Sequence, residues 1–332
     1  MAARCEAAGR KINEDNFQLS DNLESDHWGF VTNQEVTLGE KGALLVVCDG
    51  MGGMKAGATA SDLAVKTIKE WFTNSKLTPQ VMATHETIIQ YIEEAIISAD
   101  EKIKEAGRHN KELEGMGSTL VLAWIVRDNV YIGWCGDSRA YRFNAASGLE
   151  RLSHDHSYVQ ELVDRGKLSK HLAFEHPDNN IITRSLGDTR KTVQPDVKKF
   201  QLDNGDIILL CSDGLSGVLP DEAIETIILN NCDTMVDCRN ALWTESENVG
   251  WTDNVTIALC QIVSGIENAD KEFSPFPVEE KIGMTEVKRR KFGILLFIFL
   301  FLVLVGIAFE VGHFLGKGCW WFPKALFSIG NN

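Results

Sequence analysis

The amino-acid sequence predicts a layered α+β domain followed by one C-terminal transmembrane helix. Two apolar runs, Leu120–Val126 and Val130–Cys135, are joined by only three residues and must therefore pair as antiparallel strands. Segments with helical spacing of apolar residues lie between such runs elsewhere in the chain. Residues 292–309 form 18 consecutive positions without a charge, which reaches the lower limit for crossing a hydrocarbon core ~30 Å thick.

The predicted strands are short apolar runs rich in Val and Ile, and each lies next to an aspartate. A single Asp-Gly pair after a strand is more often an ordinary turn than a site. Four aspartates at strand ends, with the acidic pair Glu14 and Asp15, indicate a shared site instead. The runs and their aspartates are Ala43–Cys48 with Asp49, Val130–Cys135 with Asp137, Ile207–Cys211 with Asp213, and Val255–Cys260 with Asp253.

Four segments are expected to be helical. Apolar residues recur every three or four positions over Thr87–Ala106, which predicts one buried stripe. The segment from Asp221 follows Pro220 and carries acids in its first turn, as helix starts prefer. The expected helices are Ala58–Phe72, Thr87–Ala106, Asp221–Asn230 and Met235–Glu247.

Charge divides the chain into two physically different parts. The 332 residues carry a net charge of −14, which disfavours a nucleic-acid binder because phosphate backbones reward clustered Lys and Arg. Before Val287 there are 27 basic and 46 acidic residues, whereas from Val287 onward there are six basic residues and one acid. The body is therefore −19 and the tail +5.

The domain boundaries follow this division. We expect a folded domain over residues 1–263, a linker over 264–287, a basic flank and transmembrane helix over 288–315, and a short tail over 316–332. The alternative for the apolar segment is a buried core helix or strand. The basic run at 288–291 directly before it favours a membrane span with the body in the cytoplasm.

The N-terminus and the cysteines agree with a cytoplasmic body. Residues 1–17 contain no apolar run of the kind that a secretory signal needs. Seven of the eight cysteines lie in the body without any C-x-x-C pair, and several fall within predicted strands. We therefore expect free core thiols in a reducing compartment, not disulfides or a zinc cluster.

Carboxylates gathered at the ends of strands repel each other unless a cation neutralises them. Hard oxygen ligands without clustered His or Cys select Mg²⁺ or Mn²⁺ over zinc. The glycine after Asp49 would also let a backbone carbonyl approach the same ion. The residues by themselves therefore predict a divalent-cation site.

Six short motifs in a fixed order resemble those of one known family. They are RKINED at 10–15, VCDGMGG at 47–53, GSTL at 117–120, GDSR at 136–139, SDGL at 212–215 and DNVT at 253–256. The chain thereby resembles the bacterial form of the metal-dependent, type 2C (PPM) protein serine/threonine phosphatases over about residues 4–262. The resemblance implies a four-layer α-β-β-α sandwich of two antiparallel sheets flanked by helices.

The resemblance also implies roles for the acidic residues. Asp49 would bridge two metals, either Mn²⁺ or Mg²⁺, with the Gly50 carbonyl on one of them. Asp213 and Asp253 would complete the coordination shell of the other metal, and Glu14 and Asp15 would act mainly through metal-bound waters. Asp137, together with Asp213, would form a third, weaker metal site.

The implied chemistry is hydrolysis of phosphoserine and phosphothreonine in proteins. A hydroxide bridging the metals would attack phosphorus in line, with Asp49 and Asp213 as catalytic residues and no phosphoenzyme intermediate. Arg10 resembles the family's phosphate-binding arginine and could hold the phosphate bidentately. A cysteine-nucleophile mechanism needs a Cys-x5-Arg loop, and only four residues separate Cys5 from Arg10.

Three positions beside the implied site leave alternatives open. Many eukaryotic relatives place a histidine directly after the Asp-Gly, where this chain has Met51. The general acid would then be a metal-bound water, or His154 or His156, whose simpler interpretation is an ordinary polar loop. Arg184 either helps to bind phosphate or pairs structurally, and we favour pairing. The variable flap of the family corresponds to Ser157–Ser185, which begins with a predicted short helix.

The expected partners are phosphorylated proteins and the membrane, with no nucleic acid. A chain tethered in the bacterial cytoplasmic membrane by a single span would oppose membrane Ser/Thr kinases or act on their substrates, because tethering raises effective concentration. The alternative is a catalytically inactive binding module or membrane scaffold with the same fold. Loss of a metal carboxylate would indicate that alternative, and all the matched carboxylates are present.

Overall fold

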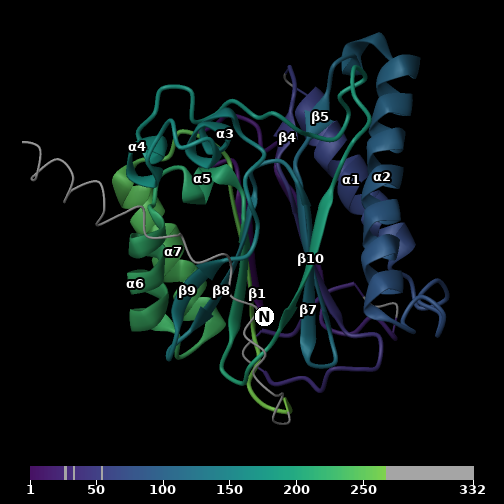
Figure 1. The fold of residues 1–332 in the computed structure, drawn as a ribbon, viewed down its shortest axis with the longest axis vertical. Helices are drawn as coiled ribbons and strands as arrows, with labels where there is room; N and C mark the ends of the chain where they lie inside the picture. The colour runs from purple at the N-terminus through teal and green to yellow at the C-terminus, as the bar shows by residue number, and fades with distance from the viewer. Residues whose placement is uncertain (26–27, 33, 54, 267–332) are drawn as a thin grey trace, which may run out of the picture. The chain divides into compact units, whose positions relative to one another are not determined.

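The computed structural model describes residues 1–25, 28–32, 34–53 and 55–266 (Figure 1). These residues belong to one compact unit, Met1–Ala269. The predicted transmembrane helix, its basic flank, the tail and most of the predicted linker lie outside the described residues. Among the residues that are described, none of the helices combines the length and the apolar character needed to span a bilayer.

Two five-stranded antiparallel sheets form the centre of the unit (Figure 1). Their strands pair with neighbours far away in the chain, so the sheets bring the two ends of the domain together. The first sheet has the order β1 (Ala2–Glu6), β12 (Val255–Gln261), β11 (Ile207–Cys211), β8 (Arg139–Asn144) and β9 (Gly148–Arg151). The second has the order β10 (Asp196–Gln201), β7 (Asn129–Cys135), β6 (Leu120–Val126), β3 (Ala43–Cys48) and β2 (Asn16–Ser20). A separate two-stranded ladder joins β4 (Gly50–Met51) to β5 (Gly117–Ser118).

Helices cover the outer face of each sheet, which gives the predicted α-β-β-α order of layers (Figure 1). Helices α1 (Ala56–Trp71) and α2 (His85–His109) pack on the second sheet, and α6 (Asp221–Asn231) and α7 (Met235–Val249) pack on the first. The shorter helices are η1 (Lys111–Leu113), α3 (Tyr158–Asp164), α4 (Lys170–Phe174) and α5 (Asp213–Ser216).

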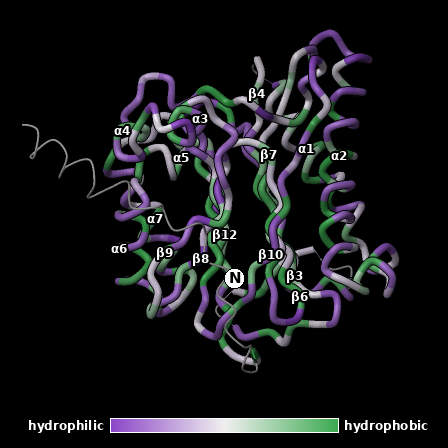
Figure 2. Tube along the Cα trace, viewed as in Figure 1, coloured by the Kyte–Doolittle hydropathy of each residue, from purple (hydrophilic) through white to green (hydrophobic). Residues whose placement is uncertain are grey.

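Three hydrophobic cores hold the layers together, one between the sheets and one under each helical layer. Successive side chains of a strand point to opposite faces, so neighbours join different cores. Leu209 of β11 packs under α6 and α7, whereas Leu210 packs between the sheets. Figure 2 shows the hydrophobic residues concentrated in the strands. Both faces of the central strands are therefore buried, which explains their continuous apolar runs.

The hairpin and the four long helices are confirmed, with ends that differ by a few residues. Leu120–Val126 pairs with Asn129–Cys135, and Arg127 adopts a φ of 54° in the tight turn between them. The strands of the two five-stranded sheets that we did not predict are β1, β2, β8, β9 and β10. Each contains residues of intermediate exposure mixed with polar side chains, so none reads as a continuous apolar run.

Trp124 offers a test of the packing between the second sheet and its helices. The indole is fully buried, contacts Phe72 edge to face, and donates from Nε1 to the Lys41 carbonyl at 2.8 Å. We expect Trp124→Ala to lower the free energy of unfolding by about 3–5 kcal/mol because it leaves a large cavity. The control Trp71→Ala removes a partly buried indole of the same layer and should cost less. Equal losses in chemical denaturation would contradict this packing.

Candidate functional site

The acidic residues singled out from the sequence meet where their strands end. Asp49 directly follows β3, Asp213 opens α5 two residues after β11, and Asp137 stands two residues after β7. Burial raises the pKa of Asp49 well above its usual range, and the neighbouring carboxylates of Asp213, Asp15 and Asp137 raise it further. The structure therefore brings these four side chains within electrostatic reach of one another.

Four buried carboxylate oxygens have no hydrogen-bond partner among the described residues. They are Glu14 Oε1, Asp15 Oδ1, Asp137 Oδ1 and Asp213 Oδ1. A buried acceptor without a donor is costly, and several in one place call for a cation. In the described part of the chain, no three or more His, Cys, Asp or Glu side chains form a closed metal-binding group. The fit of a hard divalent cation rests instead on these unpaired oxygens and on their oxygen-only chemistry.

Asp15 is oriented by two hydroxyl groups from the first sheet. Its Oδ2 accepts hydrogen bonds from Ser212 Oγ and Thr256 Oγ1, both at 2.7 Å. Burial raises the pKa of Asp15 to about 7 despite these donors, and the charges of Asp213 and Asp253 add to the increase. One oxygen of Asp15 is thus fixed by the protein, and the other is left for a ligand.

Asp49 is held through its backbone. Its N–H donates to Thr119 Oγ1 at 2.9 Å, and its carbonyl accepts from the Thr119 N–H at 2.8 Å and from Ser118 Oγ at 3.0 Å. The next residue, Gly50, must be glycine, because a Cβ there would lie 2.2 Å from the Gly57 carbonyl oxygen. The position of the Asp49 side chain therefore depends on the β4–β5 ladder.

Asn254 holds the N-terminal loop that carries Arg10 and Glu14. Its Nδ2 donates to the carbonyls of Ala7 and Ile12 at 2.9 and 2.8 Å, and its Oδ1 accepts from the Glu14 N–H at 2.9 Å. One amide side chain thereby joins the first acidic motif of the chain to the last.

Arg10 lies at this site, where its guanidinium binds the carboxylate of Asp253. Its Nε and Nη2 donate to Asp253 Oδ1 and Oδ2 at 3.0 and 2.7 Å. The same hydrogen bonds, and then the charge of Asp253, raise the pKa of Arg10. The fork that was expected to hold phosphate is thus occupied by Asp253, and a phosphate would share Arg10 with it or displace it.

The two candidate histidines are both engaged in hydrogen bonds. His156 is buried, accepts from the Gly136 N–H through Nδ1 at 3.2 Å, and lies 2.9 Å from Asp196 through Nε2. His154 lies 2.9 Å from Asp164 of α3. His156 therefore supports the backbone next to Asp137, and the identity of a general acid is not fixed by either ring.

Arg184 has the structural contacts that we favoured from the sequence. Its Nη1 lies 3.3 Å from His156 Nε2, 3.4 Å from the Gln194 carbonyl and 3.7 Å from Asp196. These distances are long for charged hydrogen bonds, and the side chain is 43% exposed. Pairing therefore leaves much of the guanidinium facing solvent.

The residues that sequence reasoning missed are the neutral ones that hold the carboxylates. Ser212, Thr256 and Thr119 supply hydroxyl groups, and Asn254 supplies an amide. Each lies in one of the six motifs, and Ser212, Asn254 and Thr256 stand within three residues of an aspartate. A hydroxyl or amide next to a strand-end aspartate was the available signal.

Comparison with known proteins agrees with this geometry. Residues 23–247 match the family model described as protein phosphatase 2C. The serine/threonine phosphatase stp of Listeria innocua is 33% identical over 222 residues, which are 67% of this chain and 85% of the relative. The crystal structure of the serine/threonine phosphatase Stp1 from Staphylococcus aureus has a TM-score of 0.67 at 29% identity, covering 80% of this chain and 94% of that one.

A further solved structure contains metal. The catalytic domain of the serine/threonine protein phosphatase PstP in complex with two manganese ions has a TM-score of 0.63 at 26% identity, covering 79% of this chain and 97% of that one. The match of the family model extends over more than half of the chain and includes the segments that carry Asp49, Asp137 and Asp213. The chain therefore belongs to the protein phosphatase 2C family of protein serine/threonine phosphatases.

Proposed function

We propose that this phosphatase hydrolyses phosphoserine and phosphothreonine in proteins with the help of two divalent cations, Mn²⁺ or Mg²⁺, held by the strand-end carboxylates. The observation that carries the proposal is the set of four buried carboxylate oxygens without a partner in the described residues. A catalytically inactive module would have no need to keep such costly groups buried.

The ligands proposed for the cations are the residues already placed at the strand ends. The charges of Asp213, Asp15 and Asp137 all act on Asp49 and raise its pKa. This central place among the carboxylates suits Asp49 to bridge two ions. The other proposed ligands are Glu14, Asp15, Gly50 through its carbonyl, Asp213 and Asp253, with Asp137 and Asp213 serving a third, weaker site. When bound, the cations would supply Lewis acidity that activates a water and offsets charge on the phosphoryl oxygens.

The protein itself would position the substrate. Arg10 is 58% exposed at the edge of the site, so a phosphate can reach its guanidinium from solvent. Competition with Asp253 would weaken phosphate binding until a cation takes over the Asp253 carboxylate. Arg10 would then turn from a structural partner into a phosphate ligand, which links substrate binding to metal loading.

We also propose that the chain acts at the bacterial cytoplasmic membrane, anchored by residues 292–309 with the catalytic domain in the cytoplasm. The 18 uncharged positions and the basic run 288–291 support this placement. Membrane Ser/Thr kinases and their substrates would be the natural opponents and targets, because a shared membrane raises their effective concentration.

Replacing the bridging carboxylate tests the metal centre. We expect Asp49→Asn to abolish hydrolysis of p-nitrophenyl phosphate and phosphopeptides at any Mn²⁺ concentration. The same variant should raise the melting temperature of the metal-free protein, because it removes a buried charge that its neighbours repel. Its melting temperature should no longer rise when Mn²⁺ is added.

Asp62→Asn is the matched control for this experiment, since Asp62 is an exposed aspartate of α1 paired with Lys66. It should keep both the activity and the stabilisation by Mn²⁺. Near-normal turnover by Asp49→Asn would show that the ligand assignment is wrong. Absence of turnover by the wild-type chain with either metal would contradict the proposed function.

The raised pKa values predict how metal removal depends on pH. Asp15 titrates near pH 7 in the folded chain and near pH 4 when unfolded, so the folded state binds more protons between these values. In EDTA the melting temperature should therefore fall as pH rises from 5 to 7.5. The gain in melting temperature on adding Mn²⁺ should grow over the same range, and Asp15→Asn should flatten both trends. A metal-free protein that becomes more stable up to pH 7.5 would contradict this account.

Truncation tests the anchor. Deletion of residues 292–332 should move the protein from the membrane to the soluble fraction and leave turnover of p-nitrophenyl phosphate unchanged, because the described catalytic unit ends before that point. A full-length protein with residues 288–291 changed to Ser controls for charge alone and should stay in the membrane. Membrane association of the truncated chain would contradict the proposal.

A further inference from the structure

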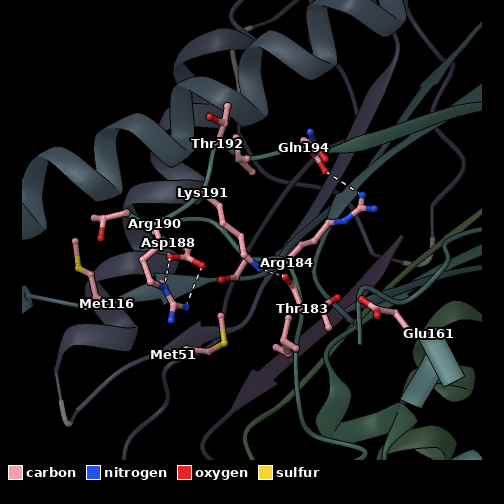
Figure 3. A pocket seen from close by; sticks show the side chains of 17 residues that line it. Met51, Met116, Glu161, Thr183, Arg184, Asp188, Arg190, Lys191, Thr192 and Gln194 are labelled. Atoms are coloured by element: carbon pink, nitrogen blue, oxygen red, sulfur yellow. Dashed lines mark hydrogen bonds and ion pairs between the residues drawn. The ribbon is translucent and has the colours of Figure 1, made fainter. Parts of the chain in front are cut away.

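A cavity of about 830 Å³ lies beside Met51, two residues after Asp49. It is lined by Met51, by residues 115–117 and by the segment 182–194, with Glu161 of α3 at one side (Figure 3). The proposed hydrolysis does not use any of these side chains. The cavity is therefore a feature that the metal centre leaves unexplained.

The cavity wall is joined directly to the strand pair that carries the metal centre. Gly50–Met51 pairs with Gly117–Ser118 in the β4–β5 ladder. Ser118 in turn exchanges two backbone hydrogen bonds with Leu186, at 3.1 and 2.8 Å. Asp49, Met51 and the wall segment thus belong to one hydrogen-bonded unit, which places the cavity beside the proposed metal centre.

The wall is also anchored to α2. Asp100 is 3% exposed, accepts from the Gly187 N–H at 2.8 Å and forms an ion pair with Lys104 at 2.7 Å. Lys104 Nζ donates to the Lys191 carbonyl at 2.8 Å. The segment is therefore held in place before any ligand arrives, as a preformed site requires.

The side chains that line the cavity carry more positive than negative charges, unlike the rest of the domain. The cavity is lined by three cations, Arg184, Arg190 and Lys191, and by only two carboxylates, Asp188 and Glu161. The domain around it has a large excess of acids over bases. Figure 3 shows Arg190 turned to Asp188 near Met51, Lys191 reaching toward Thr183, and Arg184 extending away toward Gln194.

One of these cations is available to a ligand. Arg190 is held by Asp188 through contacts of 2.9 and 3.1 Å. Arg184 is engaged with His156, Gln194 and Asp196. Lys191 is different, because its Nζ only approaches the Thr183 carbonyl at 3.4 Å, and within the described ranges no carboxylate forms an ion pair with it.

We propose that this cavity is a second substrate subsite, which takes an anionic group on the protein segment that flanks the phosphorylated residue. Lys191 binds that group, which is an Asp or Glu carboxylate or a second phosphate, and Met51, Met116 and Val193 contact the aliphatic part of the segment. The proposal rests on the proposed phosphatase function, and it names the class of substrate that the enzyme prefers.

Phosphopeptides with a single phosphoserine or phosphothreonine test this subsite on the full-length chain. One series places Glu at each position from four before to four after the phosphorylated residue, one places a second phosphate there, and one has only Ala. We expect kcat/KM to rise about three- to tenfold over the Ala peptide at one preferred spacing. The better of the two anions at that spacing identifies the ligand as carboxylate or phosphate.

Charge reversal gives the decisive variant. Lys191→Glu should abolish the preference for the anionic peptide and favour a Lys-flanked peptide instead, whereas loss of a merely structural residue would lower turnover of all peptides equally. Lys102→Glu is the matched control, because Lys102 is an exposed lysine of α2 that does not line the cavity. It should keep the wild-type ratio of kcat/KM values.

The possible failures separate the two proposals. Turnover of p-nitrophenyl phosphate and all peptides without any preference for anionic flanks would overturn the subsite alone. A preference that Lys191→Glu leaves intact would also overturn it. Absence of turnover on every substrate would contradict the proposed function and the subsite with it. A true ionic preference should also shrink at 0.5 M NaCl, since exposed charges are screened.

Discussion

Mutual repulsion among buried carboxylates is the constraint on which the rest of this structure depends. Asp15, Asp49, Asp137 and Asp213 raise one another's cost of ionisation, and burial adds to it. Such a group persists only where the surrounding fold holds every member firmly. The hydroxyls of Ser212, Thr256 and Thr119 and the closely packed backbone at Gly50 perform that task.

The two sheets supply the rigidity that this arrangement needs. Asp49, Asp137 and Asp213 each follow a strand whose residues are all buried, so these strand ends cannot shift without disturbing a packed core. Residues far apart in the chain, such as Glu14 and Asn254, then meet with a fixed geometry. The same ladder that holds Asp49 extends through Ser118 to Leu186, so the metal centre and the neighbouring cavity share one support.

Sequence patterns predicted well where burial was continuous and poorly where it was partial. The runs at Ala43–Cys48 and Ile207–Cys211 became strands with the expected bounds. Strand β10 was missed, because none of its residues Asp196–Gln201 is buried, it lies on a sheet edge, and it carries two lysines. At the site, the carboxylates were identified from their place after apolar runs, whereas the pairing of Arg10 with Asp253 could not be, since 243 residues separate them.

The sequence by itself determined the layered α+β class, the acidic strand ends and their preference for hard cations, because these follow from local periodicity and side-chain chemistry. The tertiary structure decided which oxygens are left without partners, that His156 supports Gly136, and that Lys191 and Met51 line one cavity. The physical reason is that these contacts join strands and loops that are far apart in the sequence. Their distance in the folded protein is set by the packing of the two sheets and cannot be read from their separation along the chain.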